Sequence, residues 1–210
     1  MSDSKRILTV IIGSNGAGKT TLAKNIMGEN RTTETCQFGK YTLCNNIYNT
    51  SDGIYYNNNI NIYNNIIAIG GYTNVCGGVD TVRPLKNAYK MAVDLAKKHP
   101  QANILMDSLL MSGLFSTPVK MYLELKYNFG FDVEICFLFA NEKESIRRVY
   151  SRNGNTPVNT SIICAKLKQA VRNFKKLSEL REFRCLAIDT SNKNQDGVFE
   201  QFKSWSSLYR

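Results

Sequence analysis

The segment GSNGAGKT, residues 13–20, has the residue types and spacing of a phosphate-binding loop, G-x-x-x-x-G-K-[ST]. Its glycines allow backbone amides to surround a phosphate at the start of a helix, Lys19 can reach the β- and γ-phosphates, and Thr20 can ligate magnesium. The alternative is a plain turn between a strand and a helix. We expect ATP and Mg²⁺ as cofactors. The residues assigned to nucleotide binding are Gly13, Asn15, Gly16, Ala17, Gly18, Lys19, Thr20 and Thr21.

A second chemical group is Asp107, at the end of the apolar segment NILMD, residues 103–107. A carboxylate in this place can hold magnesium through water beside a phosphate-binding loop, although Asp107 also fits a turn or a helix cap. We expect Thr20 and Asp107 to form the metal site.

The segment ESIRRVYSRNG places Arg147, Arg148 and Arg152 within two helical turns, with Arg148 and Arg152 on one face. Such arginines can form a lid that neutralises a transferring phosphoryl group and excludes water. A solvated basic helix is the alternative. Given the phosphate-binding loop, we predict a lid over residues 142–160, in which Arg148 also binds nucleotide and Arg148 and Arg152 act in catalysis.

Residues 70–85, GGYTNVCGGVDTVRPL, combine four glycines with one carboxylate, Asp80. A backbone without Cβ atoms allows a flat, bulky substrate to approach closely. The alternative is a glycine-rich turn in which Asp80 caps the helix that follows.

The elements that must position these groups alternate between strand and helix patterns. This alternation predicts one α/β domain over residues 1–210, with a five-stranded parallel sheet covered by helices on both faces. The segment 35–65 breaks the pattern, because Ile and Tyr alternate with Asn, and it predicts a small β-rich insertion. The predicted strands are 6–12, the end of 64–72, 103–107, 133–140 and 184–189, and the predicted helices are 19–28, 84–98, 119–129, 142–154, 159–183 and a last one at the C-terminus.

Composition limits the function further. The formal charge of +10 suits a polyanionic partner, although a solvated basic surface is equally compatible with it. No apolar run is long enough to span a membrane, and the N-terminus lacks a signal-peptide cleavage site, so we expect a cytoplasmic protein with no membrane partner. With His99 the only histidine and no C-x-x-C spacing, a zinc site and a Ser-His-Asp triad are poorly supported.

The order of these parts, followed by LAIDTSN near the end, resembles the nucleoside-monophosphate-kinase-like and zeta-toxin-like branch of P-loop kinases. Within it, IIAIGGYTNVCGGVDTV followed by LMDSLLMSG looks like the bacteriophage 5-hydroxymethyluridine DNA kinases. Val79 and the pair Asp107-Ser108 depart from the family's pattern. The resemblance implies transfer of the γ-phosphate of ATP to the hydroxymethyl group of 5-hydroxymethyluracil in phage DNA, before further modification of the base, in the cytoplasm of an infected cell.

The same resemblance implies roles for the glycine-rich segment. Asp80 would be the general base, Gly77 and Gly78 would allow close approach, and Tyr72 would stack on the base. Arg83 is assigned to substrate binding with them.

Other functions remain open on the sequence. A deoxynucleotide or other small-molecule kinase would use the same lid without a basic surface, and a zeta-like sugar-nucleotide kinase or a non-catalytic, nucleotide-dependent DNA-binding module would share the phosphate-binding loop. Lys168, Arg172 and Lys175 form a stripe that suits a DNA backbone, and that also fits an ordinary amphipathic helix.

Overall fold

The computed structural model describes residues 6–28, 31–44, 47–50, 53–56, 66–72 and 78–209. Its main sheet has seven strands in the order β2-β3-β6-β7-β1-β8-β9, and β4 and β5 pair in a separate two-stranded sheet. The strands are β1 (Arg6–Gly13), β2 (Arg31–Cys36), β3 (Gly39–Cys44), β4 (Ile47–Thr50), β5 (Gly53–Tyr56), β6 (Ile66–Ile69), β7 (Asn103–Ser108), β8 (Phe131–Phe139) and β9 (Arg184–Asp189).

The five strands predicted from the sequence form the parallel part of this sheet, β6-β7-β1-β8-β9. The prediction of a five-stranded sheet is nevertheless wrong in number. A hairpin of β2 and β3 adds two antiparallel strands along β6, with Thr42 opposite Ala68. Part of the predicted insertion, residues 35–65, therefore continues the main sheet, and β2 begins before it, at Arg31. Residues 45–46, 51–52 and 57–65 of that insertion lie outside the described residues.

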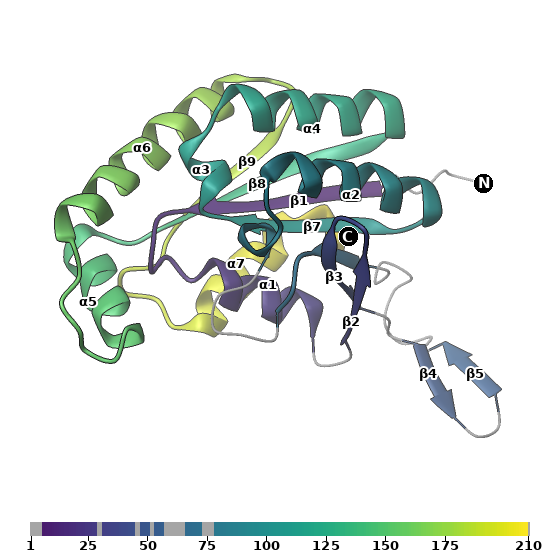
Figure 1. Ribbon diagram of the computed structural model, residues 1–210, viewed down its shortest axis with the longest axis horizontal. Coiled ribbons are helices and arrows are strands. Elements are labelled where there is room, and N and C mark those ends of the chain that lie inside the picture. The colour runs from purple at the N-terminus through teal and green to yellow at the C-terminus, as the bar shows by residue number, and fades with distance from the viewer. Residues whose placement is uncertain are drawn as a thin grey trace.

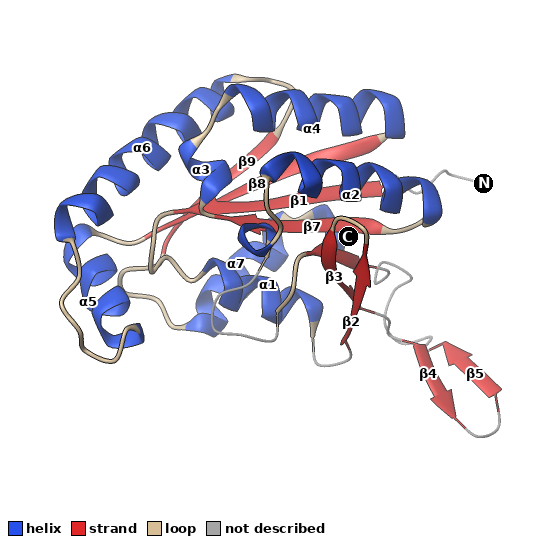
Figure 2. Ribbon diagram, viewed as in Figure 1, coloured by secondary structure: helices blue, strands red, loops and turns tan. Residues whose placement is uncertain are grey.

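Helices cover both faces of the sheet, as Figures 1 and 2 show: α2, α4 and α6 lie on one face, and α1 and α7 on the other. The helices are α1 (Lys19–Met27), α2 (Leu85–Lys98), α3 (Leu110–Gly113), α4 (Ser116–Phe129), α5 (Glu142–Arg152), α6 (Thr160–Glu179) and α7 (Gln195–Trp205), with short 3-10 helices at Val79–Thr81 and Ser207–Tyr209. The short α3, which follows β7 directly, was not predicted.

Two apolar layers result from this arrangement. Alternate side chains of β1 point to opposite faces, so that Val10 packs with α2 and α4 while Ile11 packs with α1 and α7. In α2, Ala88, Met91 and Leu95 recur at helical spacing and are buried against the sheet. Cys36, Cys136, Cys164 and Cys185 are free thiols, with Cys136 buried and the other three partly buried.

The central position of β1 decides where chemistry can take place. It lies between β7 and β8 and runs parallel to both, so its C-terminal end, Gly13, meets the end of β7 at one edge of the sheet. Ligands of open α/β sheets bind outside the C-terminal ends of the strands. In the part of the chain that the structure describes, no helix has the length and apolar character needed to cross a membrane.

Candidate active site

The phosphate-binding loop joins β1 (Arg6–Gly13) to α1, and α5 packs against it. Gly16 has φ +72°, and a Cβ on it would lie 3.0 Å from the Ser145 carbonyl oxygen and 3.2 Å from Cβ of Arg148. Glycine is therefore required there for α5 to pack against the loop. Lys19 donates from Nζ to the Ser14 carbonyl oxygen over 2.8 Å, which keeps the ammonium over the loop.

Asp107 lies directly beside the start of α1. Thr20 Oγ1 donates to Asp107 Oδ2 over 3.1 Å, and the hydroxyl of Tyr72 donates to Asp107 Oδ1. Asp107 is 1% exposed. Burial raises the pKa of its carboxyl, while the Tyr72 hydrogen bond, the charge of Lys19 and the Thr20 hydrogen bond act in the opposite direction.

The donors at this place suit magnesium. Mg²⁺ prefers oxygen ligands and is bound in nucleotide sites through one or two protein groups, water and phosphate oxygens. Thr20 and Asp107 supply a hydroxyl and a carboxylate at the foot of the phosphate-binding loop. The predicted metal pair is therefore brought together with suitable chemistry.

Asp80 lies at the same edge of the sheet, and its carboxylate holds the start of α3. Oδ1 accepts hydrogen bonds from Ser108 Oγ over 2.6 Å and from Leu110 N over 3.2 Å, and Oδ2 accepts from Leu109 N over 2.8 Å. The alternative interpretation of the sequence was that Asp80 caps the helix that follows it in the chain, which is α2. The helix it caps is α3, which comes 30 residues later in the chain.

The residues of α3 connect this carboxylate to the phosphate-binding loop. Ser112 Oγ accepts from Gly13 N over 2.8 Å and lies 2.9 Å from the Gly13 carbonyl oxygen. On its other side, α3 is tied to α6, because Gln169 donates to the Gly113 carbonyl oxygen and Asn173 to that of Ser112, over 2.7 Å and 2.9 Å. Sequence reasoning missed Ser108 and Ser112, although two hydroxyls four residues apart after a strand-end aspartate are a usable signal.

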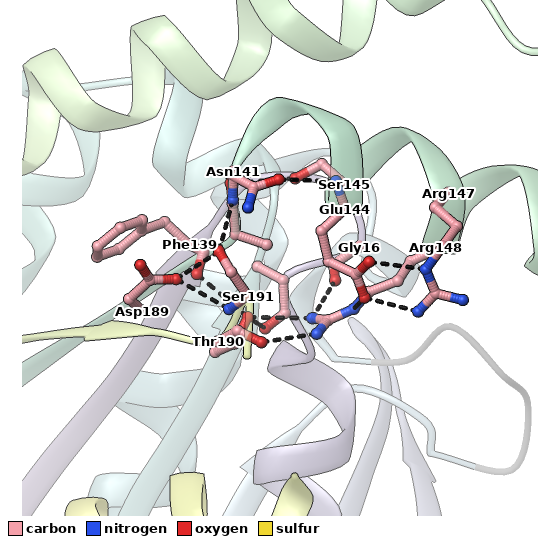
Figure 3. A network of polar contacts seen from close by, with 12 residues as sticks. Gly16, Phe139, Asn141, Glu144, Ser145, Arg147, Arg148, Asp189, Thr190 and Ser191 are labelled. Carbon is pink, nitrogen blue, oxygen red and sulfur yellow. Dashed lines mark hydrogen bonds and ion pairs between the residues drawn. The ribbon is translucent and has the colours of Figure 1, made fainter. Parts of the chain in front are cut away.

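Arg148 is the centre of a polar network that Figure 3 shows. Its guanidinium donates from Nη1 to the Gly16 carbonyl oxygen over 3.1 Å and to Thr190 Oγ1 over 3.0 Å, and from Nη2 to the Thr190 carbonyl oxygen over 2.6 Å. Its Nε donates to Glu144 over 2.7 Å. Arg148 therefore joins α5, the phosphate-binding loop and the end of β9.

The other two arginines are placed differently. Arg147 is exposed and pairs with Glu144, whose pKa the hydrogen bonds from Arg147 and Arg148 lower to about 2. Arg152 is exposed in the last turn of α5 and lines the same cavity as Arg148.

A cavity of about 450 Å³ opens over the phosphate-binding loop. Its volume lies in the range of small-molecule sites. Sequence reasoning identified Arg148 and Arg152 at one side of it but assigned no residue in the segment after β9. The lining residues are Gly16, Ala17, Gly18, Lys19, Thr20, Thr21, Leu22, Asn25, Arg148, Arg152, Thr190, Lys193, Asn194, Gln195 and Val198.

The residues that the resemblance assigns to acceptor binding differ in their exposure and in their contacts. Tyr72 is only 4% exposed, and its hydroxyl is bonded to Asp107, so its ring has no open face on which a base can stack. Gly78 packs on Asp107, and Arg83 is exposed and donates from Nε to the Asp80 carbonyl oxygen over 3.4 Å. Gly77 lies outside the described residues.

No family model and no curated protein matches this sequence. Solved structures that are similar to it include the following three. An uncharacterized protein from Eubacterium ventriosum ATCC 27560 has 10% identity and a TM-score of 0.44, covering 95% of this chain and 98% of that one. A structure from the PezAT chromosomal toxin-antitoxin system of Streptococcus pneumoniae has 20% identity and a TM-score of 0.49, covering 98% and 82%.

The third is deoxyadenosine kinase from M. mycoides with bound dATP, with 14% identity and a TM-score of 0.45, covering 94% of this chain and 98% of that one. Because these identities do not exceed 20%, a function has to be derived from the residues of the site themselves.

Proposed function

We propose that this protein is an ATP-dependent kinase that phosphorylates the hydroxymethyl group of 5-hydroxymethyluracil bases in DNA. The observation that carries the kinase assignment is the Thr20–Asp107 pair beneath the phosphate-binding loop, with the cavity lined by Arg148 and Arg152 above it. Phosphoryl transfer needs positioning and neutralisation of charge more than covalent chemistry, and these residues supply both.

Each group has a role that follows from its place. Backbone amides of the loop and Lys19 would bind the phosphates, and Thr20 and Asp107 would hold Mg²⁺, whose chemistry there would be to neutralise phosphate charge. Arg148 fixes the walls of the nucleotide cavity, because it is bonded to Gly16 and Thr190. Arg152, exposed at the cavity, can move onto the transferring group.

Asp80 is the acidic residue on the acceptor side. From the described residues its Oδ2 accepts one hydrogen bond, from Leu109 N, so we assign its second acceptor position to a hydroxyl of the acceptor. We assign to Asp80 the orientation of the acceptor hydroxyl and the acceptance of its proton. The hydrogen bonds from α3 fix the carboxylate for that purpose.

Support for a nucleic-acid acceptor comes from charge and its location. The chain carries a formal charge of +10, and α6 contains five basic residues and one acidic residue. Lys168, Arg172 and Lys175 are exposed on α6. Asn173 of α6 is bonded to α3, and α3 to Asp80, so α6 belongs to the same hydrogen-bonded group of elements as the proposed acceptor carboxylate, which supports DNA bound along α6.

A substrate panel tests the proposal. Radiolabelled γ-phosphate should transfer to DNA that contains 5-hydroxymethyluracil, and not to thymine DNA of the same sequence, free nucleosides, monophosphates or sugar-nucleotides. Transfer to one of these small molecules alone would show a kinase with a different acceptor. Absence of transfer and of hydrolysis with every acceptor would leave only nucleotide binding.

The basic face of α6 has a matched control. Replacing Lys168, Arg172 and Lys175 by alanine should weaken DNA binding and make the plot of log affinity against log salt less steep, by roughly 0.9 for each duplex phosphate that the variant no longer neutralises. Replacing Lys86, Lys97 and Lys98, three exposed lysines of α2, changes the net charge equally. Equal effects of the two triple variants would show that general charge, and not α6, binds the DNA.

A further inference from the structure

The carboxylate of Asp107 is enclosed by groups from two segments that the chemistry of phosphate binding does not require. Tyr72, which directly follows the Gly70-Gly71 pair at the end of β6, donates its hydroxyl to Oδ1. Gly78, six residues further on, packs directly on the same oxygen, since a Cβ on Gly78 would lie 1.7 Å from Oδ1. The two segments meet, because Gly78 N donates to the Gly71 carbonyl oxygen over 3.3 Å.

These contacts divide the two carboxylate oxygens between different partners. Oδ1 accepts from Tyr72 and is covered by Gly78, whereas Oδ2 faces Thr20 Oγ1 at 3.1 Å. Without the Tyr72 hydroxyl, Oδ1 of the buried Asp107 carboxylate would lack a hydrogen-bond donor. The carboxylate could regain a donor by rotating Oδ1 toward Thr20 or Lys19. The Tyr72 bond therefore selects the rotation in which Oδ2 faces the foot of the phosphate-binding loop.

We propose that Tyr72 is a positioning residue for the magnesium site: its hydroxyl holds Asp107 so that Oδ2 is presented with Thr20 to the metal of the bound nucleotide. This rests on the proposed nucleotide–magnesium site and is independent of the acceptor. It also gives Gly70 and Gly78 a structural role, because a Cβ on Gly70 would lie 2.0 Å from the Gly78 carbonyl oxygen and a Cβ on Gly78 would lie 1.7 Å from Asp107 Oδ1.

The test measures metal-dependent nucleotide binding without any acceptor or turnover. The affinity of the full-length protein for AMP-PNP, a nonhydrolysable ATP analogue, is measured by calorimetry in saturating Mg²⁺ and in EDTA. The matched control is Tyr122→Phe, because Tyr122 is 1% exposed and, among the described residues, its hydroxyl is bonded to the Met111 sulfur alone, at 3.5 Å.

We expect Tyr72→Phe to reduce the gain in affinity from Mg²⁺ by about 10- to 100-fold, the range found when an outer partner of a metal ligand is removed. Its affinity in EDTA should stay within about twofold of wild type, and Tyr122→Phe should keep the full gain. A Tyr72→Phe protein with the wild-type gain, or an equal loss in Tyr122→Phe, would overturn the role of Tyr72. A wild-type protein that gains nothing from Mg²⁺ would instead overturn the magnesium site itself.

A double variant separates positioning from packing. If Tyr72 acts through Asp107, then Tyr72→Phe should have no further effect on the magnesium gain once Asp107→Ala has removed the carboxylate. The double variant should also melt no lower than Asp107→Ala alone, because alanine at position 107 offers the Tyr72 hydroxyl no side-chain acceptor, and this comparison holds even if Tyr72→Phe by itself does not fold. A further drop in melting temperature in that background would mean that the hydroxyl serves packing elsewhere, and the proposal would fail.

Discussion

Replacing Asp80 by asparagine tests whether this carboxylate holds α3 in place. Its two oxygens accept from three donors, Ser108 Oγ and the amides of Leu109 and Leu110. Asparagine offers one acceptor oxygen, and its amide group would place a donor against a donor. We therefore expect asparagine to destabilise the protein, although it is normally as good a helix cap as aspartate.

The magnitude follows from the hydrogen bonds. A hydrogen bond to a charged group contributes about 1.5–3 kcal/mol, and because Asp80 is partly exposed we expect a loss near the lower end, about 2 kcal/mol. For a chain of this size each kcal/mol lowers the melting temperature by about 2–4 °C, so the expected shift is about 4–8 °C.

The assay is thermal melting, followed by phosphoryl transfer at a temperature at which every variant is folded. The control is Asp94→Asn, an equal charge change at an exposed position of α2. A melting temperature for Asp80→Asn that equals that of the control would refute the role in holding α3. If Asp80 also accepts the acceptor's proton, transfer by the folded variant should fall by roughly 10²- to 10⁴-fold with little change in nucleotide affinity.

Three further results are expected. Lys19→Ala should abolish phosphoryl transfer and leave the melting temperature nearly unchanged, because Lys19 bonds to a loop carbonyl and does not belong to the core; a rate within tenfold of wild type would contradict this. Arg152→Ala should lower turnover more than nucleotide affinity. Arg148→Ala should lower turnover, nucleotide affinity and melting temperature, because Arg148 joins three segments. Equal effects of the two variants on nucleotide affinity and on melting temperature would count against this difference. The pKa of Glu144 falls from an ordinary 4.5 to about 2 in the folded protein, so the charged carboxylate should stabilise the fold above pH 4.5 and lose that effect as the pH falls toward 2. The melting temperatures of Glu144→Gln and of the wild type should therefore converge between pH 4.5 and pH 2. A difference in melting temperature that stays constant over that range would argue against the ion pairs of Glu144 with Arg147 and Arg148.

The sequence predicted most of the helices and strands, because each depends on the spacing of apolar residues within a short segment. The apolar strands and the helices between them were placed from periodicity, and the five parallel strands occupy the predicted segments. The hairpin of β2 and β3 was harder, because an antiparallel pair added to a sheet edge carries no local signal for the strand that it joins. The segment 35–65 was recognised as β-rich, but its partner was not.

The candidate site shows the same division. The loop residues 13–20 follow from a motif whose spacing fixes its geometry, and Asp107 was predicted beside Thr20 from its place at the end of an apolar strand. The partners of Asp80 and Tyr72 lie 28 to 35 residues away in the chain, so a single sequence could not reveal that both side chains are already hydrogen-bonded. Burial of Tyr72 was hidden for the same reason.

The hairpin of β2 and β3 also changes which strand the sheet leaves unpaired. Without it, β6, with the sequence IIAI, would present free backbone amides and carbonyls along an apolar edge, which is a template for association with other chains. With it, the last strand is β2, whose sequence RTTETC is largely polar and includes two charged residues, a composition that disfavours such pairing. We therefore expect removal of the hairpin to promote self-association at high protein concentration.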